Sequence, residues 1–339
     1  MKYQQLLDRP NIIVAGGAGF IGSHLCDRLV KEANVICLDN FITGREENID
    51  LLLKNPHFEF IKHDLRKQIK LDDLKELEIF KVKYQGIQQI YNLACPTSPK
   101  AYHRLPIETL EANSWATKNL LDLAVTYKAK FVHTSTSAIY GEPKDNNPFS
   151  EDYWGYIDPI GPRSCYNEGK RFAESLVLNY GEHRGVNWRT ARIFNTFGPR
   201  LKINDGRLIP DFIFQALRHQ PLVIYGLPQA PATFCYVSDM IDGLVKLMQH
   251  EGQGVFNLGN PKIHSIEEVA HKILVLVNSK SKIEVNNSVP PYIVRQGIPD
   301  ISKAKEQFGW FPLISLEQGL KETVDYLRAH LDVLELKQA

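Results

Sequence analysis

Residues 11–22 read Asn-Ile-Ile-Val-Ala-Gly-Gly-Ala-Gly-Phe-Ile-Gly, and this stretch decides the fold. Its first five residues form an apolar run typical of a buried parallel strand, and the apolar spacing over residues 20–31 predicts the helix that follows. Gly16, Gly19 and Gly22 allow a tight turn, a close approach to a pyrophosphate and packing of the helix on the strand. Because a helix N-terminus also offers free N–H groups to an anion, the stretch predicts a dinucleotide-binding turn.

A second apolar run, over residues 34–38, ends in Asp39. A carboxylate at this distance after the glycines accepts the ribose hydroxyls of NAD and repels the 2′-phosphate of NADP. Strand, glycines, helix, strand and acid in this order favour a dinucleotide site over a fortuitous loop. The carboxylate of Asp39 favours NAD over NADP.

Further apolar runs alternate with helical patterns along the chain. Such alternation is typical of an α/β protein with a doubly wound parallel sheet, a Rossmann-type fold. We expect strands at 58–61, 89–93, 131–134 and 188–193, and helices at 106–126 and 166–180.

After residue 198 the pattern becomes less regular. The sequence predicts helices at 208–218, 237–249, 265–279, 301–308 and 315–331, and a strand at 222–225. We therefore expect an NAD-binding domain made of 1–196 plus 234–260, and a smaller, discontinuous substrate domain made of 197–233 plus 261–339. A cleft between the two domains is the expected substrate site.

Composition argues against several classes of function. The 339 residues include 40 basic and 39 acidic ones, so no overall field attracts nucleic acid or an anionic membrane. No apolar run is long enough to span a bilayer, and residues 1–10 lack the apolar core of a signal peptide, so we expect a cytoplasmic protein. Five cysteines without a C-x-x-C pair and eleven histidines without ligand spacing predict no metal site.

Tyr166 and Lys170 stand four residues apart in a predicted helix and therefore share one face. A lysine near both the phenol and the cofactor ribose would stabilise phenolate and lower the tyrosine pKa. A long polar connection over 141–164 leads into this helix, and such loops are usually functional. Alone, the pair also fits an exposed lysine beside a packing tyrosine. Together with the glycine turn and a strand ending in Thr136, it favours a general base for alcohol oxidation.

The stretches that carry a family resemblance are GGAGFIGSH at 16–24, DNFITG at 39–44, LACPTSP at 93–99, SEDYWG at 150–155, PIGPRSCYNEGKR at 159–171, ARIFNTFGPR at 191–200, NDGR at 204–207, YVSD at 236–239, NLGNP at 257–261 and PDISKAK at 299–305. On these residues the chain resembles the extended short-chain dehydrogenases/reductases over nearly its whole length. Among them it is most similar to the UDP-glucuronate decarboxylases. The stretches at 150–155 and 159–171 are far more specific than the cofactor glycines.

The resemblance implies a redox-neutral cycle with NAD as a retained cofactor. Tyr166, aided by Thr136 and Lys170, removes the proton of the sugar 4-hydroxyl while hydride passes from C4 to NAD. The 4-ketone turns a C5 carboxylate into a β-keto acid that loses carbon dioxide, and NADH then reduces the ketone. These three residues are the expected catalytic residues.

The resemblance also assigns contacts. It places cofactor contacts at Gly16, Gly19, Phe20, Ile21, Gly22, Asp39, Asn40, Asp64, Leu65, Leu93, Ala94, Tyr166 and Lys170, with Asp64 and Leu65 at the adenine. It places substrate contacts at Pro96, Tyr102, Ser137, Asn195, Arg207, Tyr225 and Arg295. Tyr102 is expected near the sugar, and Asn195, Arg207 and Tyr225 along the nucleotide diphosphate. The relatives are commonly dimers, so a homodimer through the helices at 106–126 and 166–180 is expected, although their apolar faces also fit an intramolecular core.

Three departures from the family lie on the substrate side. The family usually has a catalytic glutamate where this chain has Ala138, and an arginine that grips the diphosphate where it has Ala232. Arg295 stands two residues further from Pro299 than its family counterpart. Alanine offers neither charge nor hydrogen bond, so both functions are missing at these positions.

These departures leave several functions open. The first is decarboxylation of a UDP-glucuronate-like substrate, in which Ser137, Arg295 or Glu142 replaces the missing family residues. The second is epimerisation of another nucleotide sugar, because related 4-epimerases carry a small residue at the position of Ala138. Dehydration is disfavoured, since Ser137 and Ala138 replace the Asp-Glu pair of the dehydratases. A non-enzymatic NAD-binding regulator is the further alternative, against which the intact Tyr166 and Lys170 argue.

Overall fold

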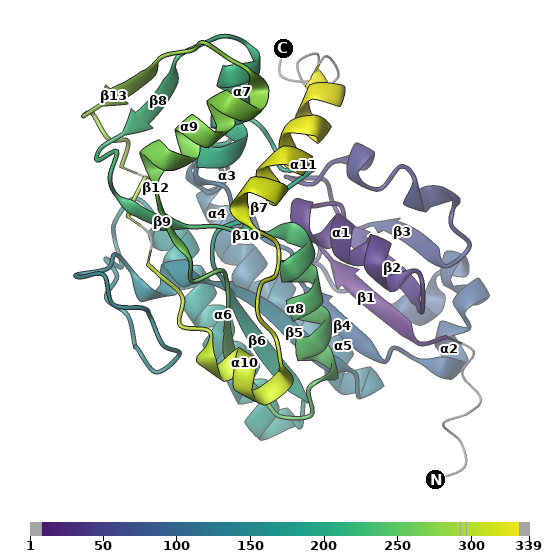
Figure 1. Ribbon diagram of the computed structural model, residues 1–339. Coiled ribbons are helices and arrows are strands. Elements are labelled where there is room, and N and C mark those ends of the chain that lie inside the picture. Colours follow the sequence, from purple (N-terminus) through teal and green to yellow (C-terminus); the bar gives the residue numbers. More distant parts are fainter. Residues whose placement is uncertain (1–8, 292, 296, 332–339) are drawn as a thin grey trace.

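A seven-stranded parallel sheet forms the centre of the protein (Figure 1), as seen in a computed structural model that describes residues 9–291, 293–295 and 297–331. The strand order is β11-β6-β5-β4-β1-β2-β3, which confirms the predicted Rossmann-type fold. The strands are β1 (Asn11–Ala15), β2 (Asn34–Asp39), β3 (Phe58–Lys62), β4 (Gln89–Asn92), β5 (Lys130–Thr136), β6 (Trp188–Ile193) and β11 (Gly254–Leu258).

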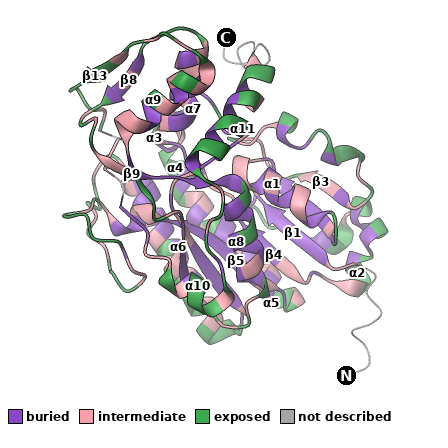
Figure 2. Cartoon of the chain, viewed as in Figure 1, coloured by how far each residue is buried: buried purple, intermediate pink, exposed green. Residues whose placement is uncertain are grey.

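Both faces of the sheet are buried at β1 and β2, which explains why these two strands are almost continuous apolar runs (Figure 2). Alternate side chains of β1 enter different cores: Ile12 and Val14 pack in one cluster, Ile13 and Ala15 in the other. A one-residue register shift would exchange the two sets, and β1 pairs in register with β2 on one side and β4 on the other.

Helices cover the two faces of the sheet. In Figure 1, α1 (Phe20–Leu29) and α8 (Val237–Gln249) lie on the near face, and these two helices contact each other. The core on the other face includes side chains from α5 (Thr117–Tyr127) and α6 (Ser164–Arg184). The remaining helices are α2 (Val82–Gln85), α3 (Pro99–Arg104), α4 (Pro106–Glu111), α7 (Leu208–Leu217), α9 (Ile266–Val277), α10 (Ser302–Phe308) and α11 (Leu316–Ala329).

The predicted helix over 106–126 is confirmed, with one irregular turn that the sequence did not predict. A π-helical turn, η5 (Ala112–Ala116), separates α4 from α5. The Thr117 hydroxyl donates to the Ala112 carbonyl five residues earlier at 3.1 Å, and Asn113 Nδ2 donates to the Thr109 carbonyl at 2.8 Å. Side chains thus stabilise the widened turn, and apolar periodicity carries no signal for such bonds.

The second half of the chain adds three two-stranded sheets, most of whose strands are too short for prediction from apolar runs. The pairs are β7 (Thr196–Phe197) with β10 (Cys235–Tyr236), β8 (Leu222–Tyr225) with β13 (Ile283–Asn286), and β9 (Pro231–Thr233) with β12 (Ile263–Ser265). β11 was also missed as a strand, although it completes the central sheet beside β6. The division into an NAD-binding and a substrate domain remains a prediction.

Within the described ranges, no helix is long and apolar enough to cross a membrane. The same part of the chain holds no group of three or more His, Cys, Asp or Glu side chains suited to a metal ion. All five cysteines are unpaired. Of the stretch 1–10 used for the signal-peptide expectation, residues 1–8 lie outside the described residues.

Candidate active site

A cavity of about 1410 Å³ runs along the carboxyl ends of the central strands. Every site residue predicted from the sequence lines it. On the cofactor side these are Gly16, Gly19, Phe20, Ile21, Gly22, Asp39, Asn40, Asp64, Leu65, Leu93 and Ala94, and the remaining ones are Pro96, Tyr102, Thr136, Ser137, Tyr166, Lys170, Asn195, Arg207, Tyr225 and Arg295. The chain therefore gathers residues almost 280 positions apart, from Gly16 to Arg295, around one space.

The glycine turn between β1 and α1 leaves no room for side chains. Gly16 has a φ of +78°, and a Cβ there would lie 2.8 Å from the Leu93 carbonyl carbon. A Cβ on Gly22 would lie 2.1 Å from the Gly16 carbonyl oxygen. The backbone thus comes close to β4 and α1 at once, and no side chain caps the N-terminus of α1. This geometry fits a pyrophosphate at the first turn of α1.

Asp39 closes the same end of the cavity from the end of β2. Its Oδ1 accepts from the Phe41 N–H at 2.8 Å and its Oδ2 from the Ala18 N–H at 3.1 Å. Burial raises the pKa of this carboxyl, and the backbone N–H groups act in the opposite direction. Two fixed N–H groups orient the carboxylate toward the cavity edge, where it can accept ribose hydroxyls.

Asp64, predicted at the adenine, is already ion-paired. Arg66 contacts its Oδ2 at 2.6 Å and also binds Glu111 at 2.6 Å. The hydrogen bond from Arg66 lowers the pKa of Asp64. If Asp64 contacts the adenine, its carboxylate oxygens must bind the adenine and the Arg66 guanidinium at the same time.

Tyr166 and Lys170 both lie on the buried side of α6. The Lys170 ammonium donates to the Thr134 carbonyl at 2.7 Å, and burial lowers its pKa. The sequence predicted a lowered tyrosine pKa, whereas burial raises the pKa of Tyr166, with hydrogen bonding to Thr136 acting in the opposite direction. Removal of water from the phenol outweighs the neighbouring groups here, so the pair is placed for proton transfer without an already ionised phenol.

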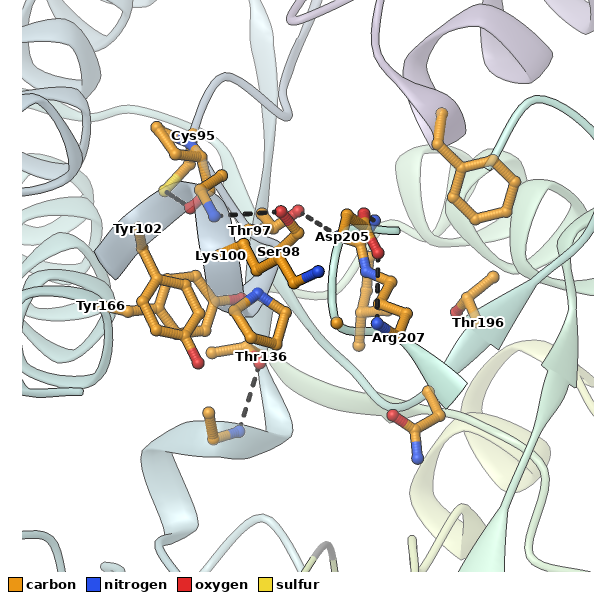
Figure 3. A pocket seen from close by; sticks show the side chains of 18 of the residues that line it. Cys95, Thr97, Ser98, Lys100, Tyr102, Thr136, Tyr166, Thr196, Asp205 and Arg207 are labelled. Atoms are coloured by element: carbon orange, nitrogen blue, oxygen red, sulfur yellow. Dashed lines mark hydrogen bonds and ion pairs between the residues drawn. The ribbon is translucent and has the colours of Figure 1, made fainter. Parts of the chain in front are cut away.

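Tyr102 packs directly on Tyr166. The ring centroids are 5.0 Å apart and the planes differ by 10°, so the rings lie face to face (Figure 3). Tyr102 is only 1% exposed, and its hydroxyl has no hydrogen-bond partner among the described residues. Beside them, Thr136 accepts from the Ala138 N–H at 3.2 Å and begins the turn that follows β5.

A fixed arginine stands on the other side of the cavity in Figure 3. Arg207 donates to Thr97 at 2.7 Å and contacts Asp205 at 2.8 Å. Asp205 is buried, so the guanidinium of Arg207 is held by one buried carboxylate and by the Thr97 hydroxyl. Such a guanidinium suits a phosphate group.

The three departures from the family all face this cavity. Ala138 lies in the turn after Thr136, and Ala232 in β9, where it pairs with His264 of β12. Arg295 binds Asn146 and the Asp145 carbonyl in the 141–164 connection. Ser137 and Glu142, the suggested substitutes for the missing glutamate, line the same cavity.

Sequence reasoning missed several charged residues of the cavity wall, among them Lys100, Arg163 and Asp211. Arg163 stands one helical turn before Tyr166, and that spacing was a usable signal. Asp211 lies in the first turn of α7, six residues after Asp205. Burial, then Asp205, raises the pKa of Asp211 to about 7.

Comparison with known proteins shows similarity over nearly the whole chain. Residues 13–323 match the family described as GDP-mannose 4,6 dehydratase. The chain belongs to this family. It is thereby an extended short-chain dehydrogenase/reductase.

Among characterised relatives, "UDP-glucuronic acid decarboxylase 1" of Arabidopsis thaliana is 44% identical over 323 residues, covering 94% of this chain and 70% of the relative. The Xenopus tropicalis protein of the same name is 43% identical over 98% of this chain and 75% of its own length. A solved Bacillus cereus UDP-glucuronic acid 4-epimerase, in complex with UDP-glucuronic acid and NAD, superimposes with a TM-score of 0.81 at 29% identity, covering 94% and 99% of the two chains.

Proposed function

We propose that the protein is an NAD-dependent enzyme that decarboxylates UDP-glucuronate, or a close relative of it, through transient oxidation at C4. The observation that carries the proposal is that Thr136, Tyr166 and Lys170 share one cavity with the glycine turn and Asp39. The decarboxylase names of relatives 42–46% identical support it. The predicted roles of individual site residues belong to this proposal.

NAD, when bound, supplies the hydride acceptor at C4 and returns the hydride at the end. Tyr166 takes the proton of the 4-hydroxyl, and Thr136 orients that hydroxyl. Lys170, held by the Thr134 carbonyl, stabilises the phenolate as it forms. Oxidation at C4 places a ketone β to the C5 carboxylate, so carbon dioxide leaves from the sugar with no further oxidant.

Epimerisation of a UDP-hexuronic acid is the second candidate. Ala138 favours it, because the chain has no carboxylate at that position next to the reacting carbons. The fold match to a UDP-glucuronic acid 4-epimerase supports it as well. The two reactions share the first hydride transfer and differ in whether the carboxylate leaves.

The deciding experiment incubates the purified protein with UDP-glucuronate and NAD and follows products by mass spectrometry and absorbance at the NADH wavelength. We expect a product lighter by one carbon dioxide. A product of unchanged mass that separates from UDP-glucuronate by chromatography would establish the epimerase. NAD binding without turnover of any nucleotide sugar would support the regulatory alternative.

We also propose a homodimer built on α4, η5 and α6. This face carries large apolar side chains exposed to solvent: Ile107 at 61%, Leu110 at 40%, Trp115 at 59% and Phe172 at 53%. A second copy of the chain would cover them. Sedimentation analysis of the wild type and of Trp115→Lys tests this, since the variant should shift toward monomer.

The cytoplasm is the compartment we propose. Five unpaired cysteines support it, because they suit a reducing environment. Fluorescence microscopy of the tagged protein in its native cell tests the location.

A further inference from the structure

The segment that follows β2 is bonded to the glycine turn. Ala18, inside that turn, donates its N–H to Asp39 Oδ2 at 3.1 Å. Its carbonyl accepts the Arg45 N–H at 3.0 Å and Asn48 Nδ2 at 2.8 Å. Ala18 is thus bonded through both of its backbone groups to residues 39–48, so a shift of the glycine turn would shift Arg45 as well.

The side chain of Arg45 contacts a distant part of the chain. Its Nη2 donates to the Arg200 carbonyl at 2.9 Å. Arg200 has a φ of +68°, a left-handed conformation that residues other than glycine adopt only at a cost in free energy. Its guanidinium forms an ion pair of 2.6 Å with Asp27 of α1. The unfavourable backbone at Arg200 is therefore supported by side chains from α1 and from the segment after β2.

Arg200 begins the stretch that leads to the fixed arginine of the substrate side, Arg207. Two apolar side chains between them are buried in the core. Burial lowers the pKa of Arg45, and Tyr326 and Asp205 act in the opposite direction. Asp205 is also the carboxylate that contacts Arg207 at 2.8 Å. The Arg45 guanidinium therefore lies within electrostatic range of this ion pair.

These contacts join the two ends of the cavity through one side chain. Arg45, Arg200 and Arg207 all line the cavity. A dinucleotide on the glycine turn would fix Ala18, and a phosphate on Arg207 would fix the stretch that begins at Arg200. Each ligand would order one end of the bonds made by Arg45, so binding of one ligand lowers the cost of binding the other.

We propose that Arg45 couples the two ends of the cavity, so that a nucleoside diphosphate bound at the substrate end slows the release of NAD. The inference rests on the proposed function, which puts the diphosphate of a nucleotide sugar beside Arg207. Such coupling has a use in the proposed cycle, because the hydride taken from C4 must return to the same sugar before the cofactor leaves.

The test measures how fast radiolabelled NAD leaves the loaded protein in excess unlabelled NAD, with and without saturating UDP. UDP carries the diphosphate without the sugar, so no turnover occurs. In the wild type we expect UDP to slow NAD release about tenfold. In Arg45→Gln this slowing should fall below about twofold, while release without UDP stays within about threefold of wild type. The backbone bond from residue 45 to Ala18 remains in this variant.

Three further variants complete the comparison. Arg45→Lys keeps the charge near Asp205 and should recover part of the slowing. Arg28→Gln is the matched control, because Arg28 lies on α1, pairs with Glu32 and does not line the cavity. Arg45→Met has no side-chain donor and repeats the measurement if Arg45→Gln does not fold. Thermal unfolding and calorimetry with UDP verify that each variant is folded and binds UDP.

Equal slowing in the wild type and in a folded Arg45→Gln or Arg45→Met would overturn the proposal, because UDP would then retain NAD merely by covering it. Release that UDP does not slow in the wild type would overturn it as well. A wild type in which UDP slows release through Arg45, but which frees no carbon dioxide from UDP-glucuronate, would refute the proposed decarboxylation and leave the coupling standing.

Discussion

The two ends of the cavity are built differently. At the cofactor end, backbone atoms define the geometry. Gly16 and Gly22 are confined by neighbouring main-chain atoms, and the Asp39 carboxylate is held by two backbone N–H groups. At the substrate end, long side chains hold one another: Arg207 binds Asp205 and Thr97.

This difference indicates that the substrate end of the cavity can accept substitutions that the cofactor end cannot. A backbone site tolerates almost no substitution, because each added Cβ meets main-chain atoms 2–3 Å away at Gly16 and Gly22. A site made of side chains can lose a group, as at Ala138 and Ala232, without disturbing the fold. Hydride chemistry is therefore tied to the sheet, and substrate choice is left to residues that can be replaced individually.

The largest effect is expected when the phenol of Tyr166 is removed, because this group is proposed to act on the substrate while NAD is held by the glycine turn and Asp39. Tyr166→Phe should reduce turnover about 10³-fold, because the phenol is the proposed acceptor of the C4 hydroxyl proton. NAD affinity should stay within about twofold of wild type. Steady-state rates with UDP-glucuronate and calorimetry with NAD measure both. Tyr180→Phe, on the same helix and bonded to Asp122 outside the cavity, is the matched control. Undiminished turnover in Tyr166→Phe would sink the mechanism.

A carboxylate introduced at the substrate end tests whether that end can change without loss of the fold. Ala138→Glu is expected to raise the rate of carbon dioxide release from UDP-glucuronate by about 10- to 100-fold, since acid–base groups contribute on this scale. Ala138→Gln has nearly the same shape without charge and serves as the control. If Glu brings no gain over Gln, the chain is adapted to another substrate.

At the cofactor end, a loss of charge should weaken binding instead of altering the reaction. Asp39→Asn should lower NAD affinity about tenfold, because an amide NH₂ would meet one of the N–H groups of Ala18 and Phe41. The preference for NAD over NADP should also shrink, since the repelling charge is gone. Titrations with both dinucleotides measure the ratio, and an unchanged ratio would contradict the role of Asp39.

The smallest effect on the reaction itself is expected at Asp211, where the change concerns stability. The pKa of Asp211 is raised to about 7, so the folded state keeps a proton that the unfolded state releases near pH 4. Stability should therefore decline as pH rises from about 4 to 7 and stay lower above that. Asp211→Asn should remove this decline and stabilise the protein at pH 8 by about 2–4 kcal/mol.

Melting temperatures of wild type and Asp211→Asn at pH 5 and pH 8 test this, with the exposed Asp50→Asn as control. A gain at pH 5 as large as that at pH 8 would mean that the carboxyl does not titrate in this range.

The sequence predicted the fold and the cavity wall well because both depend on local patterns. The glycine turn, Asp39 and the Tyr166–Lys170 spacing are read within a few residues each, and all of them line the cavity. Properties that arise from packing were not predictable. The raised pKa of Tyr166 comes from burial, and the stacking of Tyr102 on Tyr166 joins two helices far apart in the sequence. Short strands such as β9 exist only because a distant partner pairs with them.

The widened turn Ala112–Ala116 accommodates one extra residue in the helix that runs from α4 to α5. Asn113 in that turn donates to Cys95 at 3.2 Å, and a Cβ on Gly169 would lie 3.0 Å from its amide nitrogen. Deleting one residue from this turn would restore regular α-helical hydrogen bonds and leave Leu120 and Leu121 facing the core, because the π turn takes up the extra residue. The extra residue therefore matters for the position of Asn113 against Cys95 and Gly169, and not for the packing of α5.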